Sequence, residues 1–169
     1  MASSSSEVSH LGPAPTLPVA RLFVLAPLLA LAVVGSAYFL LRPQLPAQLA
    51  RHIGPDGVGL SSTGVVLLIG SGVAAALFVV ALCCAIDFWK HEHWYQTQKM
   101  MVVGFAASGY AVSGLLLASI FNVRGVDPAA ASGASIGYGL LAFLVVLIIA
   151  IWSYVVLLPA GKFEEPWGS

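Results

Sequence analysis

The hydrophobic residues of this chain fall into four long runs separated by shorter polar intervals. No charged residue lies between Arg21 and Arg42, Asp56 and Asp87, Lys99 and Arg124, or Asp127 and Lys162. Each gap holds enough apolar residues to cross the hydrocarbon core of a bilayer as a helix, which takes about 20 residues. Lipid offers the backbone no hydrogen-bond partners, so such runs form helices whatever their strand propensity. The pattern predicts membrane-spanning helices over residues 22–41, 64–86, 100–121 and 135–158.

We therefore expect an all-α fold, an integral membrane bundle of four transmembrane helices over residues 21–158. A polar outer loop, residues 42–63, follows the first helix. Residues 1–20 carry a serine run and several prolines but little apolar surface, which predicts a disordered tail. Residues 159–169 form a C-terminal tail. Pro27 lies early in the first run, where its missing N–H predicts a bend.

Composition agrees with a membrane location. Of the 169 residues, 59% are hydrophobic and 8% are charged, whereas about a quarter of the residues in soluble domains are charged. Seven basic and seven acidic residues balance one another, and no clustered basic face suggests nucleic-acid binding. The lipid bilayer is the expected environment.

The basic residues that flank the runs favour an orientation with both termini in the cytoplasm, by four to three. With the N-terminus inside, the inner flanks hold Arg21, Lys90, Lys99 and Lys162, and the outer flanks hold Arg42, Arg51 and Arg124. The aromatic residues expected to anchor the inner interface are Trp89, Trp94, Tyr95 and Trp167.

Small residues recur at four-residue spacing, which lets helix backbones approach closely. This spacing predicts packing within the bundle, and a face for association with another membrane protein or a second copy is the alternative. The pairs are Gly70 with Ala74, Gly72 with Ala76, Gly104 with Ser108, Gly109 with Ser113, Gly133 with Gly137, and Ser135 with Gly139.

Ionisable residues are missing from the middle of every run, where proton relays and ion pathways normally place one. The four histidines also lie outside the runs, which argues against haem held between helices. No nucleophile, base and orienting group can be assembled from one face. We therefore expect a non-enzymatic protein without a cofactor.

The connector between the second and third runs contains the metal-capable residues that lie closest together. Cys84, Asp87 and His91 share a helical face if the second helix continues past the membrane. His93 joins them only if the backbone turns there. Thiolate and imidazole suit zinc or copper, so metal handling is one hypothesis. The alternative is that Cys83 and Cys84 are apolar fillers and that Asp87, Lys90, His91 and Lys99 form a solvated interfacial cap.

The outer loop is the other candidate site. Leu45, Leu49 and Ile53 recur every four residues, which predicts a short amphipathic turn over residues 46–52 on the membrane surface. The sequence Gly-Pro-Asp-Gly at residues 54–57 is a turn signal. Ser61, Ser62 or Thr63 can cap the second helix. His52 titrates near physiological pH, as a ligand or merely as a surface histidine.

The order of residues in this loop resembles the signature of a bacterial family of membrane domains of unknown function. Leu45-Pro46 is followed by Leu49, then by His52, and then by Gly57 after Asp56. The same domain opens the Sdp-type immunity proteins, which protect cells against a secreted peptide toxin. Ala50 replaces the usual second proline, and Val58, Gly59 and Leu60 replace the usual aromatic and acidic residues. The resemblance implies the bacterial cytoplasmic membrane and an outward-facing loop.

Three functional hypotheses follow. The first is a membrane accessory or interaction protein that packs on a larger complex. The second is an outward-facing immunity or sensor protein that recognises an extracytoplasmic peptide through Pro46, Leu49, Arg51, His52, Asp56 and Gly57. The third is metal handling at the connector between the second and third runs.

Overall fold

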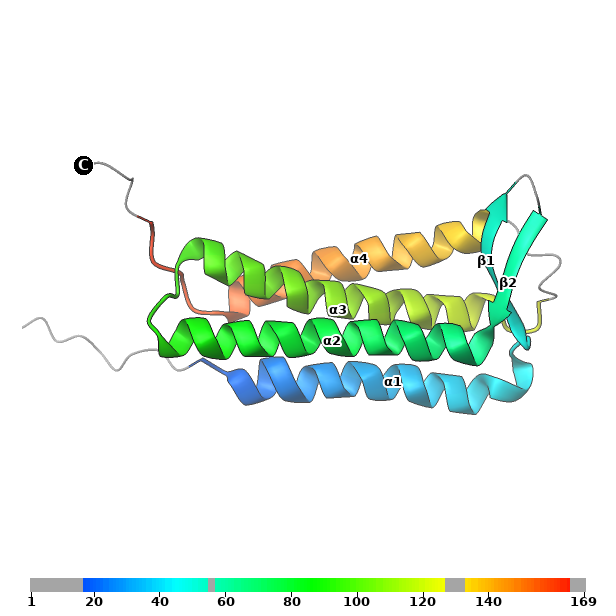
Figure 1. The fold of residues 1–169 in the computed structure, drawn as a ribbon, viewed down its shortest axis with the longest axis horizontal. Helices are drawn as coiled ribbons and strands as arrows, with labels where there is room; N and C mark the ends of the chain where they lie inside the picture. The colour runs from blue at the N-terminus through cyan, green and yellow to red at the C-terminus, as the bar shows by residue number, and fades with distance from the viewer. Residues whose placement is uncertain (1–16, 55–56, 127–132, 165–169) are drawn as a thin grey trace, which may run out of the picture.

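The computed structural model describes residues 17–54, 57–126 and 133–164, without the side chains of residues 50–58, 60 and 133–136. Four long helices run side by side (Figure 1), and each is long and apolar enough to cross a membrane. This arrangement confirms the all-α four-helix fold class. The elements are η1 (Ala20–Leu25, a π-helical turn), α1 (Ala26–Leu41), η2 (Arg42–Gln44), β1 (Gln48–Gly54), β2 (Gly57–Ser62), α2 (Thr63–Lys90), α3 (Gln96–Asn122) and α4 (Gly133–Leu157).

Helix α3 is the centre of the bundle, because α1, α2 and α4 all pack on it. In its most apolar stretch 44% of the residues are buried, against 11–22% in the other three helices. The remaining helices therefore expose most of their large apolar side chains. In water such a surface would drive aggregation, whereas lipid solvates it without cost.

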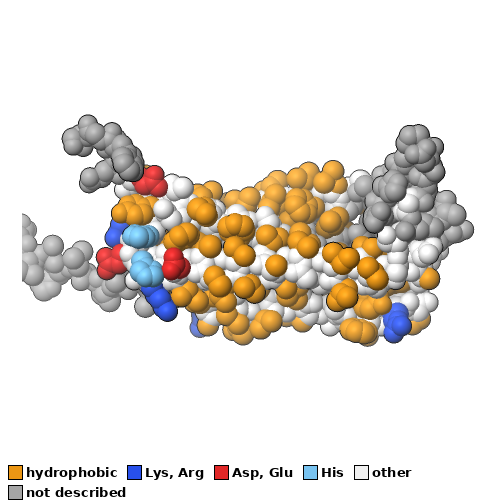
Figure 2. Space-filling model, in the orientation of Figure 1, with side chains coloured by type: hydrophobic (Ala, Val, Ile, Leu, Met, Phe, Trp, Pro, Cys, Tyr) orange, Lys and Arg blue, Asp and Glu red, His pale blue; other side chains and the backbone are white. Residues whose placement is uncertain are grey.

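Charged side chains lie at the two ends of the molecule, histidine side chains are visible at one of them, and hydrophobic side chains cover its length (Figure 2). We call the end that carries β1 and β2 the hairpin end. The end where His91–Tyr95 meets residues 158–164 is the connector end (Figure 1). Polar ends and an apolar middle are the distribution that a bilayer requires. The chain is a small multi-pass membrane protein.

Close approach between helices depends on glycine at specific positions. A Cβ atom at Gly109 of α3 would lie 2.6 Å from the ring of Phe78, and one at Gly70 of α2 would lie 2.6 Å from Leu116. At Gly139 of α4 the distance to Leu115 would be 2.9 Å. Three of the six small-residue pairs thus have a glycine that packs against a neighbouring helix, as the spacing predicts.

The outer loop differs from the expectation. Residues 46–52 do not form an amphipathic helical turn. Strands β1 and β2 instead pair antiparallel as a hairpin that Gly54 and Gly57 close, with an irregularity between Ala50 and His52. Gly54 and Gly57 pair at the position of the expected turn, but the four-residue apolar spacing did not produce a helical turn. Strand pairing satisfies the backbone groups along the facing edges of the two strands, whereas one isolated helical turn gains few hydrogen bonds for the residues that it orders.

The connector between α2 and α3 is shorter than expected, since α2 continues to Lys90 and α3 begins at Gln96. Ser62 occupies the N-cap position of α2 but makes no capping hydrogen bond through its side chain. Residues 1–16, the greater part of the expected N-terminal tail, and Trp167 lie outside the described residues.

Glycine packing in α3 gives a first prediction. We expect Gly109→Ala to destabilise the protein by about 1–3 kcal/mol, because its methyl group overlaps the Phe78 ring. Thermal unfolding in a mild detergent, followed by circular dichroism, measures the change. Gly104→Ala is the matched control: its Cβ meets no atom within 4 Å, so the variant should be neutral or more stable by up to ~1 kcal/mol. Equal effects of the two variants would contradict this account of the packing.

Candidate functional site

One backbone carbonyl near the start of the first helix lacks a donor within that helix, and a side chain from the last helix supplies the hydrogen bond. The N–H of Ala26 donates to the carbonyl of Arg21, five residues back, and so does not serve Leu22. The next residue, Pro27, has no N–H to offer. The hydroxyl of Tyr154 in α4 donates a hydrogen bond to the carbonyl of Leu22. Proline thus frees an acceptor that tyrosine satisfies, and the first helix begins with the π-helical turn η1.

Aromatic side chains continue this contact through the bundle, one from each helical segment. The ring of Phe23 in η1 packs edge-on against Tyr154, with ring centroids 5.6 Å apart. The hydroxyls of Tyr154 and Tyr110 in α3 are 3.2 Å apart and hydrogen-bonded. Tyr110 in turn packs edge-on against Phe78 of α2 at 4.8 Å. This chain of four aromatic residues links all four helices, and we call it the aromatic chain.

The connector end contains a buried lysine. Lys99 is only 5% exposed, and its Nζ donates to the carbonyls of Val155 at 2.9 Å and Leu158 at 3.1 Å. These carbonyls lie in the last turn of α4 and just beyond it, where backbone acceptors lack helical partners and the helix dipole favours a cation. Lys99 is therefore not part of a solvated interfacial cap. It closes the C-terminus of α4.

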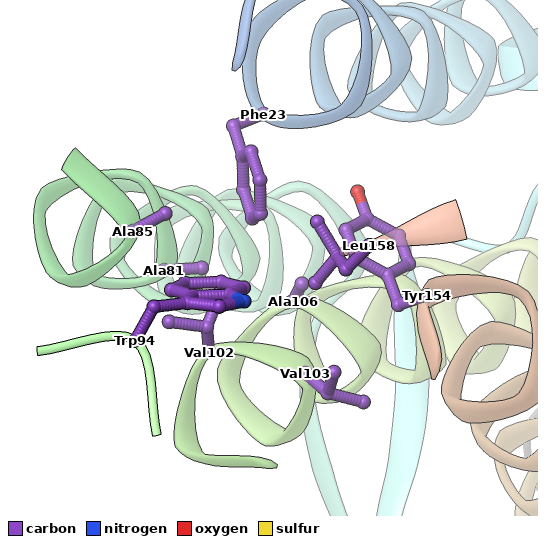
Figure 3. Close-up of a cluster of buried hydrophobic side chains, with 9 residues drawn as sticks. All are labelled: Phe23, Ala81, Ala85, Trp94, Val102, Val103, Ala106, Tyr154 and Leu158. Carbon is purple, nitrogen blue, oxygen red and sulfur yellow. The ribbon is translucent and has the colours of Figure 1, made fainter. Parts of the chain in front are cut away.

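Trp94 also differs from the expectation. It is 5% exposed and belongs to the buried cluster that includes Phe23 and Tyr154 (Figure 3). Its Nε1 donates to the carbonyl of Pro159 at 3.1 Å. Trp94 is thus a core residue rather than an anchor in the lipid interface. Its sequence position beside polar residues hid this role.

Backbone pairing extends the contact between the connector and the segment after α4. The N–H of Gln96 donates to the carbonyl of Lys162 at 3.0 Å, and the N–H of Lys162 donates to the carbonyl of Trp94 at 2.8 Å. The beginning of the expected C-terminal tail is therefore hydrogen-bonded to the start of α3.

The hairpin end places the predicted loop residues on β1, on β2 and at their root. Leu49 is buried, with 8% exposure. The hydroxyl of Thr63 donates to the carbonyl of Pro46. Arg51 and His52 lie on β1, but their side chains are outside the described residues, as is the whole of Asp56.

Gly57 begins β2 opposite Gly54. The root of the hairpin is tied to the end of α3, because the N–H of Gly125 donates to the carbonyl of Gln44 at 3.0 Å. The residues just before β1 are therefore hydrogen-bonded to the start of α2, through Thr63, and to the turn after α3, through Gly125.

The proposed metal ligands are only partly brought together. His91 Nδ1 lies 3.3 Å from a carboxylate oxygen of Asp87. The chain turns after Lys90, so the rings of His91 and His93 are 6.4 Å apart. Cys84, however, packs against the buried cluster. Among the residues that the structure describes, no group of three or more His, Cys, Asp or Glu side chains is placed to hold a metal ion.

The small-residue pairs that do not pack inside the bundle remain open. A Cβ atom at Gly72, Gly104 or Gly137 would meet no neighbouring atom within 4 Å. Gly72 and Ala76 both lie on the exposed side of α2. The helices α2, α3 and α4 thus each carry an inward-facing glycine and an outward-facing one. We call Gly72 and Ala76 the open small-residue surface.

Sequence reasoning missed Tyr110, Tyr154 and the structural role of Lys99. A signal for Tyr154 was present, since a proline inside one apolar run leaves a carbonyl that a hydroxyl in another run can satisfy. The sequence does not say which hydroxyl reaches it.

No family model, curated protein or solved structure matches this chain in the comparisons with known proteins. The resemblance of the outer loop to the bacterial domain family therefore stays a prediction.

The tie between η1 and α4 gives a second prediction. We expect Tyr154→Phe to destabilise the protein by about 1–3 kcal/mol, because it leaves the carbonyl of Leu22 without a donor in the apolar part of the bundle. In a Pro27→Ala background the helix regains an N–H at that place, and the same substitution should cost about 1 kcal/mol less. A double-mutant cycle from unfolding in detergent measures this difference.

Tyr138→Phe is the control for this cycle. Tyr138 is 60% exposed on α4, so its loss should change stability by less than ~0.5 kcal/mol. If Tyr154→Phe costs the same in the wild type and in the Pro27→Ala background, the proline does not create the need for the hydroxyl.

Proposed function

We propose that the protein is a non-enzymatic accessory protein that binds a transmembrane helix of another membrane protein. The observation that carries this proposal is the open small-residue surface. Apolar lipid chains adapt to any surface and need no glycine, whereas a protein helix approaches closely only where small residues make room. Gly72 and Ala76 lie one helical turn apart, which is the spacing of such contacts.

The polar groups inside the helices support the same proposal. Ser113 and Ser119 of α3 donate to the carbonyls of Gly109 and Leu115 in their own helix, at 2.9 and 2.8 Å. Ser153 of α4 does the same with Ile149, at 2.7 Å. These hydroxyls are satisfied within the molecule, and the two tyrosines of the aromatic chain hydrogen-bond to each other. What the open surface offers a partner is therefore shape rather than reactive chemistry.

Site-specific photo-cross-linking in native membranes tests this function. A photoreactive residue at Ala76 should form one discrete product with a different protein, and Gly72→Leu should remove at least 90% of that product. The same photoreactive residue at Leu141, which is exposed on α4, should form no discrete product because it faces lipid.

A product of twice the chain's mass would show self-association and would overturn the accessory role. Random products at Ala76, like those at Leu141, would show that lipid covers the surface. Circular dichroism and gel filtration in detergent confirm that Gly72→Leu folds.

The hairpin supports a second candidate, recognition of an extracytoplasmic peptide. A sheet of two strands leaves an outer edge on each strand, and an extended peptide can add to such an edge through main-chain hydrogen bonds. Arg51 and His52 lie on β1, within the loop that resembles the immunity-type domain. The basic-residue count, four against three, favours placing this loop outside.

Deletion of the gene should then sensitise the cells to a secreted peptide. The double variant His52→Ala, Asp56→Ala should likewise make the cells at least tenfold more sensitive than wild type. Growth inhibition across a dilution series of conditioned medium measures it. His91→Ala with His93→Ala, at the opposite end, is the matched control and should behave as wild type. Wild-type resistance in the hairpin variant would exclude these two side chains from recognition.

A further inference from the structure

A hollow on the outer surface of α1 remains unused by the functions proposed above. Its volume is about 450 Å³, and it runs along α1 to the end of α3. Leu29 and Leu40 of α1 and Phe121 of α3 border it, and all three are more than half exposed. The small side chains of Ala32, Ser36 and Ala37 leave the space between them. We call this hollow the α1–α3 groove.

The length of the groove fits one lipid acyl chain. From Leu29 to Leu40 the helix rises by about 16 Å, and one leaflet contributes about 15 Å of hydrocarbon. The groove is open to the surface and lined almost entirely by apolar side chains, so a flexible acyl chain can lie along it.

Two arginines stand at the hairpin end of the groove. Arg42 directly follows α1 and Arg124 lies just beyond α3, and both are exposed. The two turns that carry them are in contact, because the N–H of Gly125 donates to the carbonyl of Gln44 at 3.0 Å. Guanidinium groups bind phosphate oxygens in paired hydrogen bonds. Arg42 follows Leu41 and Arg124 comes three residues after Phe121, and both of these apolar residues line the groove, so the two arginines lie at the end where the phosphate of a lipid in the groove would be.

We propose that the α1–α3 groove is a binding site for one anionic phospholipid of the leaflet on the hairpin side. One acyl chain lies along α1 between Leu29 and Leu40, and the phosphate is held by Arg42 and Arg124. The positive charge of the two arginines selects an anionic headgroup over a zwitterionic one. The site is separate from the open small-residue surface, which lies on α2.

Native mass spectrometry of the full-length protein tests the site. The protein is released from nanodiscs that contain equal amounts of phosphatidylglycerol and phosphatidylcholine with identical acyl chains. We expect one retained phosphatidylglycerol, preferred over phosphatidylcholine. Arg42→Gln and Arg124→Gln should each lower this preference by roughly fivefold, since each basic residue contributes about that factor at a membrane surface. The double variant should bring the ratio close to one.

Filling the groove separates chain binding from headgroup binding. Ala32→Leu with Ser36→Leu should remove the retained lipid of either headgroup. Ala76→Leu places one added leucine on the exposed side of α2 and should retain the lipid unchanged. Arg21→Gln, at the connector end, is the control for charge. Should the filled variant fail to fold, the ratio in the double arginine variant still decides the proposal.

Equal retention of the two lipids by the wild type would overturn the proposal. An unchanged preference in the double arginine variant would overturn it as well, as would a retained lipid in a correctly folded Ala32→Leu, Ser36→Leu variant.

Discussion

A membrane supplies no water to complete the hydrogen bonding of a backbone, and this constraint accounts for the most specific contacts in the molecule. Where a helix is regular, its own N–H groups satisfy its carbonyls. Where it breaks or ends, a side chain must do so. Tyr154 serves the carbonyl that Pro27 leaves free in η1, and Lys99 serves the carbonyls at the end of α4.

Both contacts join segments far apart along the chain, so completing the backbone also fixes the tertiary arrangement. The tyrosine binds the last helix to the first, and the lysine binds the start of α3 to the end of α4. Van der Waals packing alone would leave apolar helices free to slide against one another. Directed hydrogen bonds in an apolar medium restrict that freedom, because breaking one exposes an unsatisfied carbonyl to lipid. The buried cluster around Trp94 lies at the same end of the bundle (Figure 3).

The glycines of the helices divide into two functional sets. Those that face Leu116, Phe78 and Leu115 set the distances between helices inside the bundle. Those at positions 72 and 104 meet no neighbouring atom within 4 Å, and we propose the first of them as a contact for a second protein. The α1–α3 groove is lined by other residues, and we propose it as a site for a lipid.

The sequence by itself determined the four spans, the turn at Gly54–Gly57 and the polar ends, because length, hydropathy and turn chemistry are local properties. It did not show which of the two glycines in each helix faces the bundle, because the inward-facing and outward-facing glycines occur in small-residue pairs of the same spacing. It misassigned Trp94 and Lys99 as interfacial, since both lie beside polar residues along the chain. Their burial comes from α4 and residues 158–162, more than 50 positions later. The hairpin likewise depended on the pairing of two segments, whereas the apolar period within one of them suggested a helical turn. Only the tertiary structure decided these points, because each depends on contact with another segment of the chain.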